Sequence, residues 1–171
     1  MNIFCISVRT GAEEKYKKGV DAVLSSYRWE CDGCLHLLKK QMRLKTGKEY
    51  SEQFFPGYVF FETEEQDFTK FRFFRSVNGF LRFLPSNTAL HPLEGKDLRI
   101  VQTILNCGST VGIVPVTFDK NDRIVITDGP FKDMSGKVVS VNRRNKRLNI
   151  ELEFMGGMQI VGLSYEVVHK L

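Results

Sequence analysis

The stretch FFPGYVFF, residues 54–61, decides how the first part of this chain folds. Pro56 and Gly57 are typical of a turn, and the β-branched and aromatic residues after them favour a strand. At this length the run predicts a central strand rather than a helix. It carries more aromatic surface than one face of a small sheet normally hides, so we expect part of that surface to stay exposed for a partner.

Hydrophobic periodicity on both sides of this strand predicts an α+β domain over residues 1–107. The expected elements are a strand at 3–8, a helix at 11–28, a hairpin turn at 45–48, the central strand ending near Thr63, a helix at 67–77, a strand at 80–84 and a helix at 95–107. This order of strands and helices is typical of a ferredoxin-like sandwich, the split βαβ arrangement.

Two local signals mark helix ends in this domain. Thr10 followed three residues later by Glu13 predicts a capping box, in which each side chain satisfies an unpaired backbone N–H at the start of the first helix. Gly108 follows the last helix and predicts its stop, because glycine accepts the left-handed conformation that ends many helices.

The pattern changes after residues 108–117, which we expect to be a linker. From residue 118 onward only strand signals occur, and residues 148–154 alternate strictly between apolar and polar side chains. The expected strands lie at 124–126, 137–141, 148–154, 158–163 and 167–168. Five short strands over 118–171 predict a small SH3-like β-barrel, which removes its sheet edges by closing on itself.

Composition limits the classes of protein to consider. The chain has 171 residues and a formal net charge of +5, which allows a nucleic-acid or acidic-protein partner. No apolar run approaches the roughly 20 residues needed to cross a bilayer, so we expect no membrane contact. The start of the chain has no signal-peptide pattern and the four Cys form no disulfide pattern, so we expect a cytoplasmic protein.

Candidate metal and catalytic residues are sparse. Cys31 and Cys34, with His36 close by, form a lone CxxC, whereas a structural zinc site needs a second pair of ligands. The three His are scattered, and no P-loop, GxSxG or HExxH motif occurs. We therefore expect no metal, no cofactor and no enzymatic activity.

Two blocks of sequence resemble the NusG family of transcription elongation factors. The first comprises residues 55–60 together with 75–83, and the second, residues 118–138, looks like the start of a KOW motif. The chain departs from the usual family pattern at residues 121–122 and 155–157. The basic segment 141–147 resembles the specialised antiterminators of the LoaP branch.

The resemblance implies a concrete function for each domain. The first domain would bind the clamp helices of the largest RNA polymerase subunit, oppose opening of the clamp and so suppress pausing or termination. The residues that match the polymerase-facing surface of the family are Tyr58, Phe60, Phe83 and Arg9. Aromatic side chains suit such an interface because they bury much area at low entropy cost.

The resemblance to the LoaP branch implies that the KOW domain contacts structured leader RNA. The residues expected to bind nucleic acid are Arg143, Arg144, Lys146 and Arg147, with Lys132 and Lys137 extending the same face. Guanidinium groups pair with phosphate oxygens, and positive charge releases counterions from nucleic acid. The plainer interpretation is a solvated turn between two strands.

Two other functions stay open. A general NusG would use its KOW domain to bind a ribosomal protein or Rho, which favours an exposed apolar patch on the barrel over a basic loop. A ribosome-associated structural KOW protein is the second alternative. In each case we expect a monomer.

Overall fold

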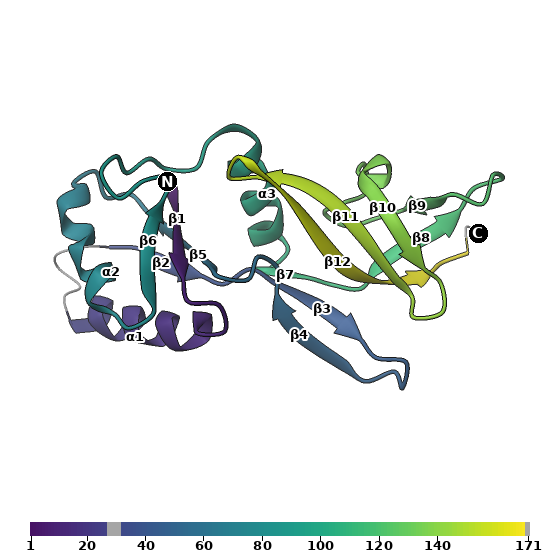
Figure 1. The fold of residues 1–171 in the computed structure, drawn as a ribbon, viewed down its shortest axis with the longest axis horizontal. Coiled ribbons are helices and arrows are strands. Elements are labelled where there is room, and N and C mark those ends of the chain that lie inside the picture. The colour runs from purple at the N-terminus through teal and green to yellow at the C-terminus, as the bar shows by residue number, and fades with distance from the viewer. Residues whose placement is uncertain (27–31, 170–171) are drawn as a thin grey trace. The chain divides into compact units, whose positions relative to one another are not determined.

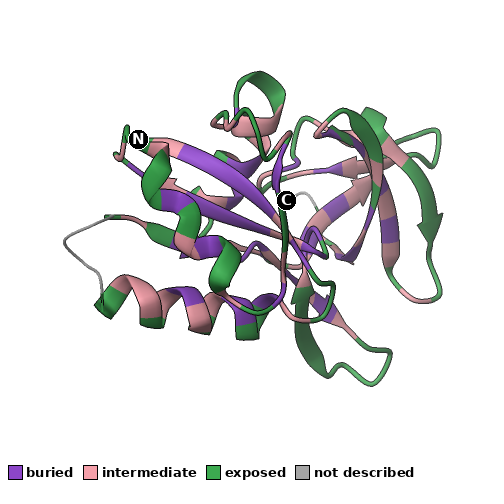
Figure 2. Cartoon of the chain, turned by 60° about the vertical axis from the view of Figure 1, so that its left-hand side comes forward, coloured by how far each residue is buried: buried purple, intermediate pink, exposed green. Residues whose placement is uncertain are grey.

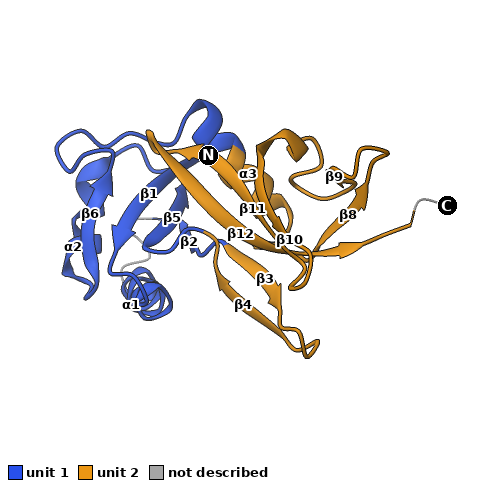
Figure 3. Cartoon of the chain, turned by 45° about the vertical axis from the view of Figure 1, so that its right-hand side comes forward, with its two compact units in different colours: residues 1–38, 55–99 blue, residues 39–54, 100–171 orange. Residues whose placement is uncertain are grey.

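The structure is a computed structural model that describes residues 1–26 and 32–169. The chain forms two compact units, shown in Figure 3. The first unit comprises residues 1–38 and 55–99, and the second comprises residues 39–54 and 100–171. The units are described separately below.

The first unit is built on a four-stranded antiparallel sheet with the strand order β2-β5-β1-β6 (Figure 1). Its strands are β1 (Asn2–Val8), β2 (Cys34–His36), β5 (Tyr58–Thr63) and β6 (Phe80–Leu84). Strand β5, which the FFPGYVFF stretch predicts, lies between β2 and β1 and is therefore an internal strand. The strand order confirms the expected ferredoxin-like arrangement.

The helices follow the predicted order with shorter bounds. They are α1 (Glu13–Ser26), the 3-10 helix η1 (Phe68–Arg72), α2 (Phe73–Ser76) and α3 (Gly95–Asn106). The expected end of the first helix, residues 27 and 28, lies outside the described residues. The helix expected at 67–77 is divided into η1 and α2, and Asp67 caps η1 by accepting a hydrogen bond from the Thr69 N–H.

Aromatic rings fill the core of the first unit. Figure 2 shows the buried segments of its strands in purple. Its fully buried aromatic members include Phe4, Phe61, Phe71, Phe74 and Phe83, each at most 1% exposed. Their rings meet edge to face, as in the Phe61–Phe74 pair with centroids 4.8 Å apart, which is a favoured geometry for aromatic pairs. The Tyr16 hydroxyl donates a buried hydrogen bond of 2.9 Å to the Phe74 carbonyl, which ties α1 to α2.

The aromatic run itself is more buried than the sequence suggested. Phe54, Phe55, Phe60 and Phe61 are each at most 2% exposed, whereas Tyr58 is half-buried. Val59, Phe61 and Thr63 are buried on one face of β5, and on the other face Phe60 is buried between the half-buried Tyr58 and Glu62. The expected exposed aromatic surface is therefore reduced to Tyr58.

The predicted capping box at Glu13 is wrong. The Glu13 carboxylate is only 3% exposed, and its Oε1 accepts a hydrogen bond of 2.7 Å from the Gly57 N–H. Gly57 is also buried, so its N–H needs a protein acceptor in place of water. Glu13 thus joins the start of α1 to the turn that enters β5.

The second unit contains a five-stranded sheet with the order β10-β11-β12-β8-β9. Its elements are β8 (Val114–Phe118), β9 (Ile124–Ile126), the 3-10 helix η2 (Ser135–Lys137), β10 (Val138–Asn142), β11 (Arg147–Phe154) and β12 (Gly157–Val167). The sheet curls in the manner of an SH3-like barrel, as expected. Strand β12 pairs antiparallel with β11 along its first part and parallel with β8 from Tyr165 onward.

Two of the expected barrel features differ in the structure. Strand β8 occupies residues that the sequence assigned mainly to a linker, and residue 167 ends β12 instead of starting a separate strand. Pro115 explains the first difference, because proline within a run argues against a strand in sequence reasoning. The second arises because one strand of 11 residues serves two neighbours in turn.

A hairpin completes the second unit. Strands β3 (Lys39–Arg43) and β4 (Glu49–Gln53) pair antiparallel, and β7 (Thr110–Val111) pairs with β3. The predicted turn at 45–48 is confirmed, since Leu44 N–H donates to the Lys48 carbonyl at 2.8 Å. The sequence assigned this hairpin to a domain over 1–107, whereas it belongs to the second compact unit, so the domain bounds stay a prediction.

Among the described helices, none has both the length and the apolar character that a membrane crossing requires.

The turn at Gly57 generates the first prediction. Gly57 has φ +84, and an added Cβ would lie 3.0 Å from Thr10 Oγ1 and 3.4 Å from the Val8 carbonyl oxygen. Gly11 lies in the same unit with φ +87 and open space around it. Gly57→Ala should therefore reduce the free energy of unfolding by about 1–3 kcal/mol more than Gly11→Ala, because it adds crowding to the same backbone strain.

Denaturant unfolding of the two variants beside the wild-type chain measures this difference. Equal losses for Gly57→Ala and Gly11→Ala would show that packing at this turn does not matter.

Candidate functional site

The first candidate surface lies where three strands of the first unit meet. In the strand register, Ser7 of β1 is opposite Tyr58 of β5 on one side and Arg82 of β6 on the other. Residues opposite one another across strands share a face of the sheet, so these three side chains form one row. Tyr58 and Ser7 are half-buried and Arg82 is exposed. Arg9, one residue beyond β1, is also exposed, and its N–H donates to the Gly79 carbonyl.

The structure separates the four residues expected to face a polymerase. Phe83 lies opposite Ile6 in the row that enters the aromatic core, and its ring packs against Phe74 and Phe80. Phe60 lies two residues after Tyr58 on the same face of β5 and is completely buried. Tyr58 and Arg9 therefore present surface, whereas Phe60 and Phe83 contribute almost none.

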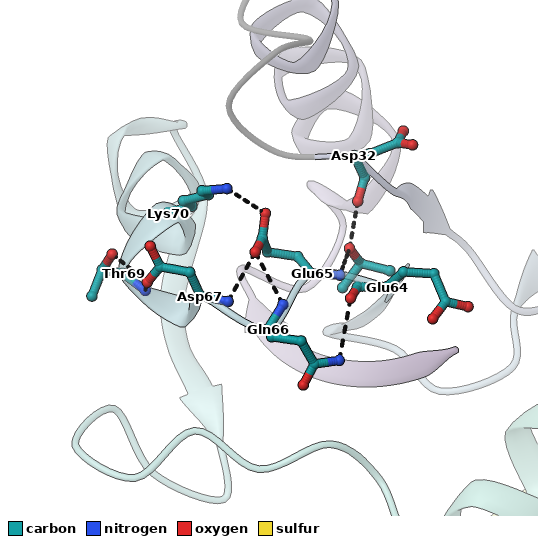
Figure 4. Close-up of polar contacts among 8 residues, drawn as sticks. Asp32, Glu64, Glu65, Gln66, Asp67, Thr69 and Lys70 are labelled. Carbon is teal, nitrogen blue, oxygen red and sulfur yellow. Dashed lines mark hydrogen bonds and ion pairs between the residues drawn. The ribbon is translucent and has the colours of Figure 1, made fainter.

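A polar network fixes the segment between β5 and η1 (Figure 4). Lys70 Nζ lies 2.7 Å from Glu65 Oε2, and the other oxygen of Glu65 accepts hydrogen bonds from the Gln66 and Asp67 N–H groups. The hydrogen bond from Lys70 is the main cause that lowers the pKa of Glu65. Hydrogen bonds from Thr69 likewise lower the pKa of Asp67. These contacts hold the entry to η1, which carries Phe71 into the core.

The second candidate surface is the turn between β10 and β11, where the basic run lies. Arg143 bends back onto the barrel, since its guanidinium lies 2.8 Å from Asp122 Oδ2 and 4.3 Å from the centroid of the Phe118 ring. A guanidinium over a ring face gains cation–π attraction. Arg143 also borders a shallow hollow, called the apolar hollow below after Phe118, Val139 and Val141, although polar and charged residues line it as well.

The other basic residues serve different parts of the second unit. Arg147 Nη2 donates to the Arg43 carbonyl at 3.1 Å and to the Tyr50 hydroxyl at 3.4 Å, so this guanidinium joins the barrel to the hairpin. Lys132 and Lys137 are both exposed. Lys137 directly precedes β10 and Arg143 directly follows it, so these two residues lie at opposite ends of the strand. The structure therefore does not gather all six predicted nucleic-acid residues.

Sequence reasoning missed two basic residues that the structure places beside this turn. Arg144 and Lys146 line a hollow of roughly 390 Å³ together with Arg43 and Lys45 of the β3–β4 hairpin. The signal was present in the hairpin, where five cations occur within ten residues: Lys39, Lys40, Arg43, Lys45 and Lys48. These hairpin residues were overlooked because the hairpin and the β10–β11 turn fall in different predicted domains, so nothing in the sequence placed the two side by side.

Several hydrogen bonds hold the hairpin along β12. Lys40 Nζ donates to the Gly162 carbonyl at 2.7 Å, and the Arg43 N–H donates to Ser164 Oγ at 3.0 Å. Burial lowers the pKa of Lys40, against the opposing effect of Glu52. The Arg43 guanidinium lies 2.7 Å from Glu49 and 3.5 Å from Glu166, and the hydrogen bond to Glu49 raises its pKa.

The lone CxxC lies only partly within the described residues. Cys31 lies outside the described residues, and His36 Nε2 lies 2.8 Å from Glu62 Oε2. Within residues 1–26 and 32–169, no three His, Cys, Asp or Glu side chains gather as metal ligands would.

Comparison with known proteins gives consistent matches over both parts of the chain. The model of a family described as "Transcription termination factor nusG" matches residues 1–102, and a model of the KOW motif matches residues 120–151. A protein of Yersinia pestis named "Transcription termination/antitermination protein NusG" is 29% identical over 126 residues, which are 72% of this chain and 68% of that protein. A protein of the same name from Streptococcus pyogenes serotype M1 is 28% identical over equal shares.

One solved structure supports the fold. The structure titled "Domain interaction in Thermotoga maritima NusG" matches with a TM-score of 0.63 and covers 95% of this chain and 93% of that one. Its sequence is 22% identical, so the likeness concerns the fold.

The Lys70–Glu65 contact generates a prediction about pH. Lys70→Met should raise the pKa of Glu65 part of the way towards its ordinary value of 4.5, since the two backbone donors remain. A lowered carboxyl pKa stabilises the fold above that ordinary value, and the contribution is lost as pH falls. Lys70→Met should therefore lose less stability than the wild-type chain as the pH falls through the pKa of Glu65. Carboxyl NMR titration measures this pKa in both chains. Lys17→Met, which breaks a separate pair with Asp21, is the control. An unchanged Glu65 titration in Lys70→Met would contradict the assignment.

Proposed function

Because this chain belongs to the NusG family of transcription factors, we propose that it is an elongation factor that binds RNA polymerase and suppresses pausing and termination. The named relatives are termination and antitermination proteins, which supports a function in transcription without catalysis. The proposed partner of the first domain is the pair of clamp helices on the largest polymerase subunit. We place the complex in the cytoplasm, with the factor acting as a monomer.

The row Tyr58–Ser7–Arg82 is the observation that carries this proposal. It combines a half-buried aromatic ring with an exposed guanidinium on one sheet face, and Arg9 lies just beyond it. Tyrosine and arginine are frequent interface anchors, since each offers apolar area and a polar group at one position. In this proposal Tyr58 and Arg9 touch the polymerase, Phe60 is the buried neighbour of Tyr58 on the same sheet face, and Phe83 holds β6 in the core.

The mechanism follows from differential binding. A factor that binds both sides of a closed clamp loses contacts when the clamp opens, so its binding energy favours the closed state. It shifts that equilibrium only by the difference between its affinities for the two states. No bond is made or broken by the factor, which agrees with a site that consists of an aromatic ring and two guanidinium groups.

The finer proposal is a LoaP-like antiterminator whose KOW barrel contacts structured leader RNA. Arg144 and Lys146 support it, because they lie in the exposed turn between β10 and β11 and face a common hollow. Arg143 supports it less, since Asp122 already neutralises its charge. Lys132 and Lys137 would add long-range attraction for phosphate groups at some distance from this turn.

A second candidate function has its own observation. Val139 is 51% exposed and Val141 is 38% exposed, and both line the hollow that contains Phe118. An exposed apolar hollow suits a protein partner, which favours a general factor that binds a ribosomal protein or Rho. A ribosome-associated structural KOW protein is less well supported, because the family match extends over residues 1–102 and not the KOW motif alone.

The polymerase surface gives the main test. Tyr58→Ala in the full chain should weaken binding to core RNA polymerase about thirtyfold, the loss of a residue worth roughly 2 kcal/mol at an interface. Arg82→Glu should act in the same direction without disturbing the core, since Arg82 is exposed. Ile160→Ala, which removes an exposed side chain from β12, is the control. Unchanged affinity in both Tyr58→Ala and Arg82→Glu, with wild-type unfolding midpoints, would refute this surface.

The two barrel functions can be separated by transcription in vitro. On a template with a structured leader before a terminator, Arg144→Ala should lower terminator readthrough, whereas Val139→Ala should not, because a valine offers nothing to phosphate groups. Equal loss from both variants, or loss from Val139→Ala alone, would favour a protein partner at the apolar hollow.

A further inference from the structure

Two segments far apart in the sequence line one basic hollow in the second unit. The β3–β4 hairpin contributes Arg43 and Lys45, and the β10–β11 turn contributes Arg144 and Lys146. No acidic residue lines this hollow in the described chain. Its volume of roughly 390 Å³ is in the range of pockets that hold small ligand groups.

The charges around this hollow are only partly neutralised. Arg43 is paired with Glu49 and Glu166. In contrast, Lys45, Arg144 and Lys146 have no carboxylate within ion-pair distance among the described residues. Three cations held around one hollow repel each other, and a bound anion would relieve that repulsion. The hollow therefore favours a ligand with more than one negative charge.

The backbone of the turn holds Lys146 in an unusual conformation. Lys146 has φ +51, a left-handed region that glycine or asparagine normally occupies. The turn is nevertheless fixed, because Asn142 Oδ1 accepts from the Asn145 N–H at 3.0 Å and the Lys146 carbonyl accepts from the Tyr165 N–H at 2.9 Å. Strain of this kind is often found at binding sites.

The hairpin is fixed as firmly as the turn. Lys40, Arg43 and Arg147 all make hydrogen bonds between β3 and the barrel strands. Lys45 therefore extends from a support that does not have to be ordered when a ligand binds. Such preorganisation lowers the entropy cost of binding.

Asn145 indicates which anion fits. It lines the same hollow, and its buried Oδ1 has no hydrogen-bond partner among the described residues. A buried carbonyl oxygen normally has a donor. The phosphodiester of a DNA backbone has no proton to donate, whereas the 2′-hydroxyl of RNA is a donor close to each backbone phosphate. Rotation of the amide towards the hollow would let Oδ1 accept from that hydroxyl.

We propose that the β3–β4 hairpin and the β10–β11 turn form one groove that binds the RNA backbone. Lys45, Arg144 and Lys146 contact phosphate oxygens, Arg43 borders the groove, and Asn145 accepts from a ribose hydroxyl. This proposal rests on the proposed RNA contact of the barrel and adds the hairpin to it. RNA recognition is then shared between the hairpin and the KOW barrel.

The test measures binding of the full chain to a fluorescein-labelled RNA hairpin over a series of salt concentrations. A DNA hairpin of the same sequence is the second probe. The variants are Lys45→Ala for the hairpin half and Arg144→Ala for the barrel half. Lys48→Ala is the matched control, because Lys48 is an exposed lysine in the same hairpin turn that does not line the hollow. Unfolding midpoints establish that every variant is folded.

The proposal expects Lys45→Ala and Arg144→Ala each to weaken RNA binding about tenfold at moderate salt and to reduce the slope of log K against log salt by about 1. Lys48→Ala should stay within about twofold of wild type, since it loses only distant charge. The wild-type chain should also bind RNA more tightly than DNA. This set of results would support the shared groove.

Three results would overturn it, and they are distinguishable. If Arg144→Ala weakens binding but Lys45→Ala matches Lys48→Ala, the hairpin has no part and the proposed RNA contact of the barrel stands. If RNA and DNA bind equally, the groove is a general polyanion site. If the wild-type chain does not bind the RNA hairpin, the proposed RNA contact fails together with the groove.

Discussion

The hydrogen bond from the Gly57 N–H to the buried Glu13 carboxylate is the contact on which the first unit depends. It fixes the turn that enters β5, while the Gly57 carbonyl accepts from the Val8 N–H and so sets the register of β5 against β1. A shift of one residue would move every side chain of β5 to the opposite face. The register places Val59 in the core and Tyr58 in the row that faces outward. The candidate polymerase surface is therefore a consequence of this turn.

Local patterns predicted most of the fold, because they depend on neighbours in the sequence. The FFPGYVFF stretch, the hairpin turn at 45–48 and the alternation at 148–154 each specify an element whose residues are contiguous. The same reasoning gave a wrong prediction for Glu13. Its hydrogen-bond partner, Gly57, is 44 residues away, whereas the capping rule considers only the adjacent helical turn. Strand β8 was not predicted, because Pro115 suggested a break in the strand pattern. Its pairing with β12 is a long-range contact, which the local pattern does not report.

The candidate site was less predictable than the fold. The sequence indicated that residues 143–147 are basic, but not that Arg143, Arg144 and Arg147 have three different surroundings. Arg143 lies on Phe118, Arg147 bonds to the hairpin, and Arg144 lines the hollow. The sequence shows how many charged residues this turn has, whereas binding depends on which of their charges lack a partner. Whether a charge has a partner depends on the direction of its side chain, and in a tight turn that direction changes from one residue to the next.

The apolar hollow and the basic groove lie on either side of the β10–β11 turn, and they share no lining residue. Arg143 faces the first with its charge balanced by Asp122, whereas Arg144 and Lys146 face the second with their charges unbalanced. A protein in the apolar hollow need not displace RNA from the groove, because neither ligand requires the contacts of the other. The antiterminator and the general factor are thus distinguished by which of the two surfaces is occupied. If both surfaces can be occupied at once, bound RNA could hold the barrel near the polymerase while its apolar hollow stays available to a protein.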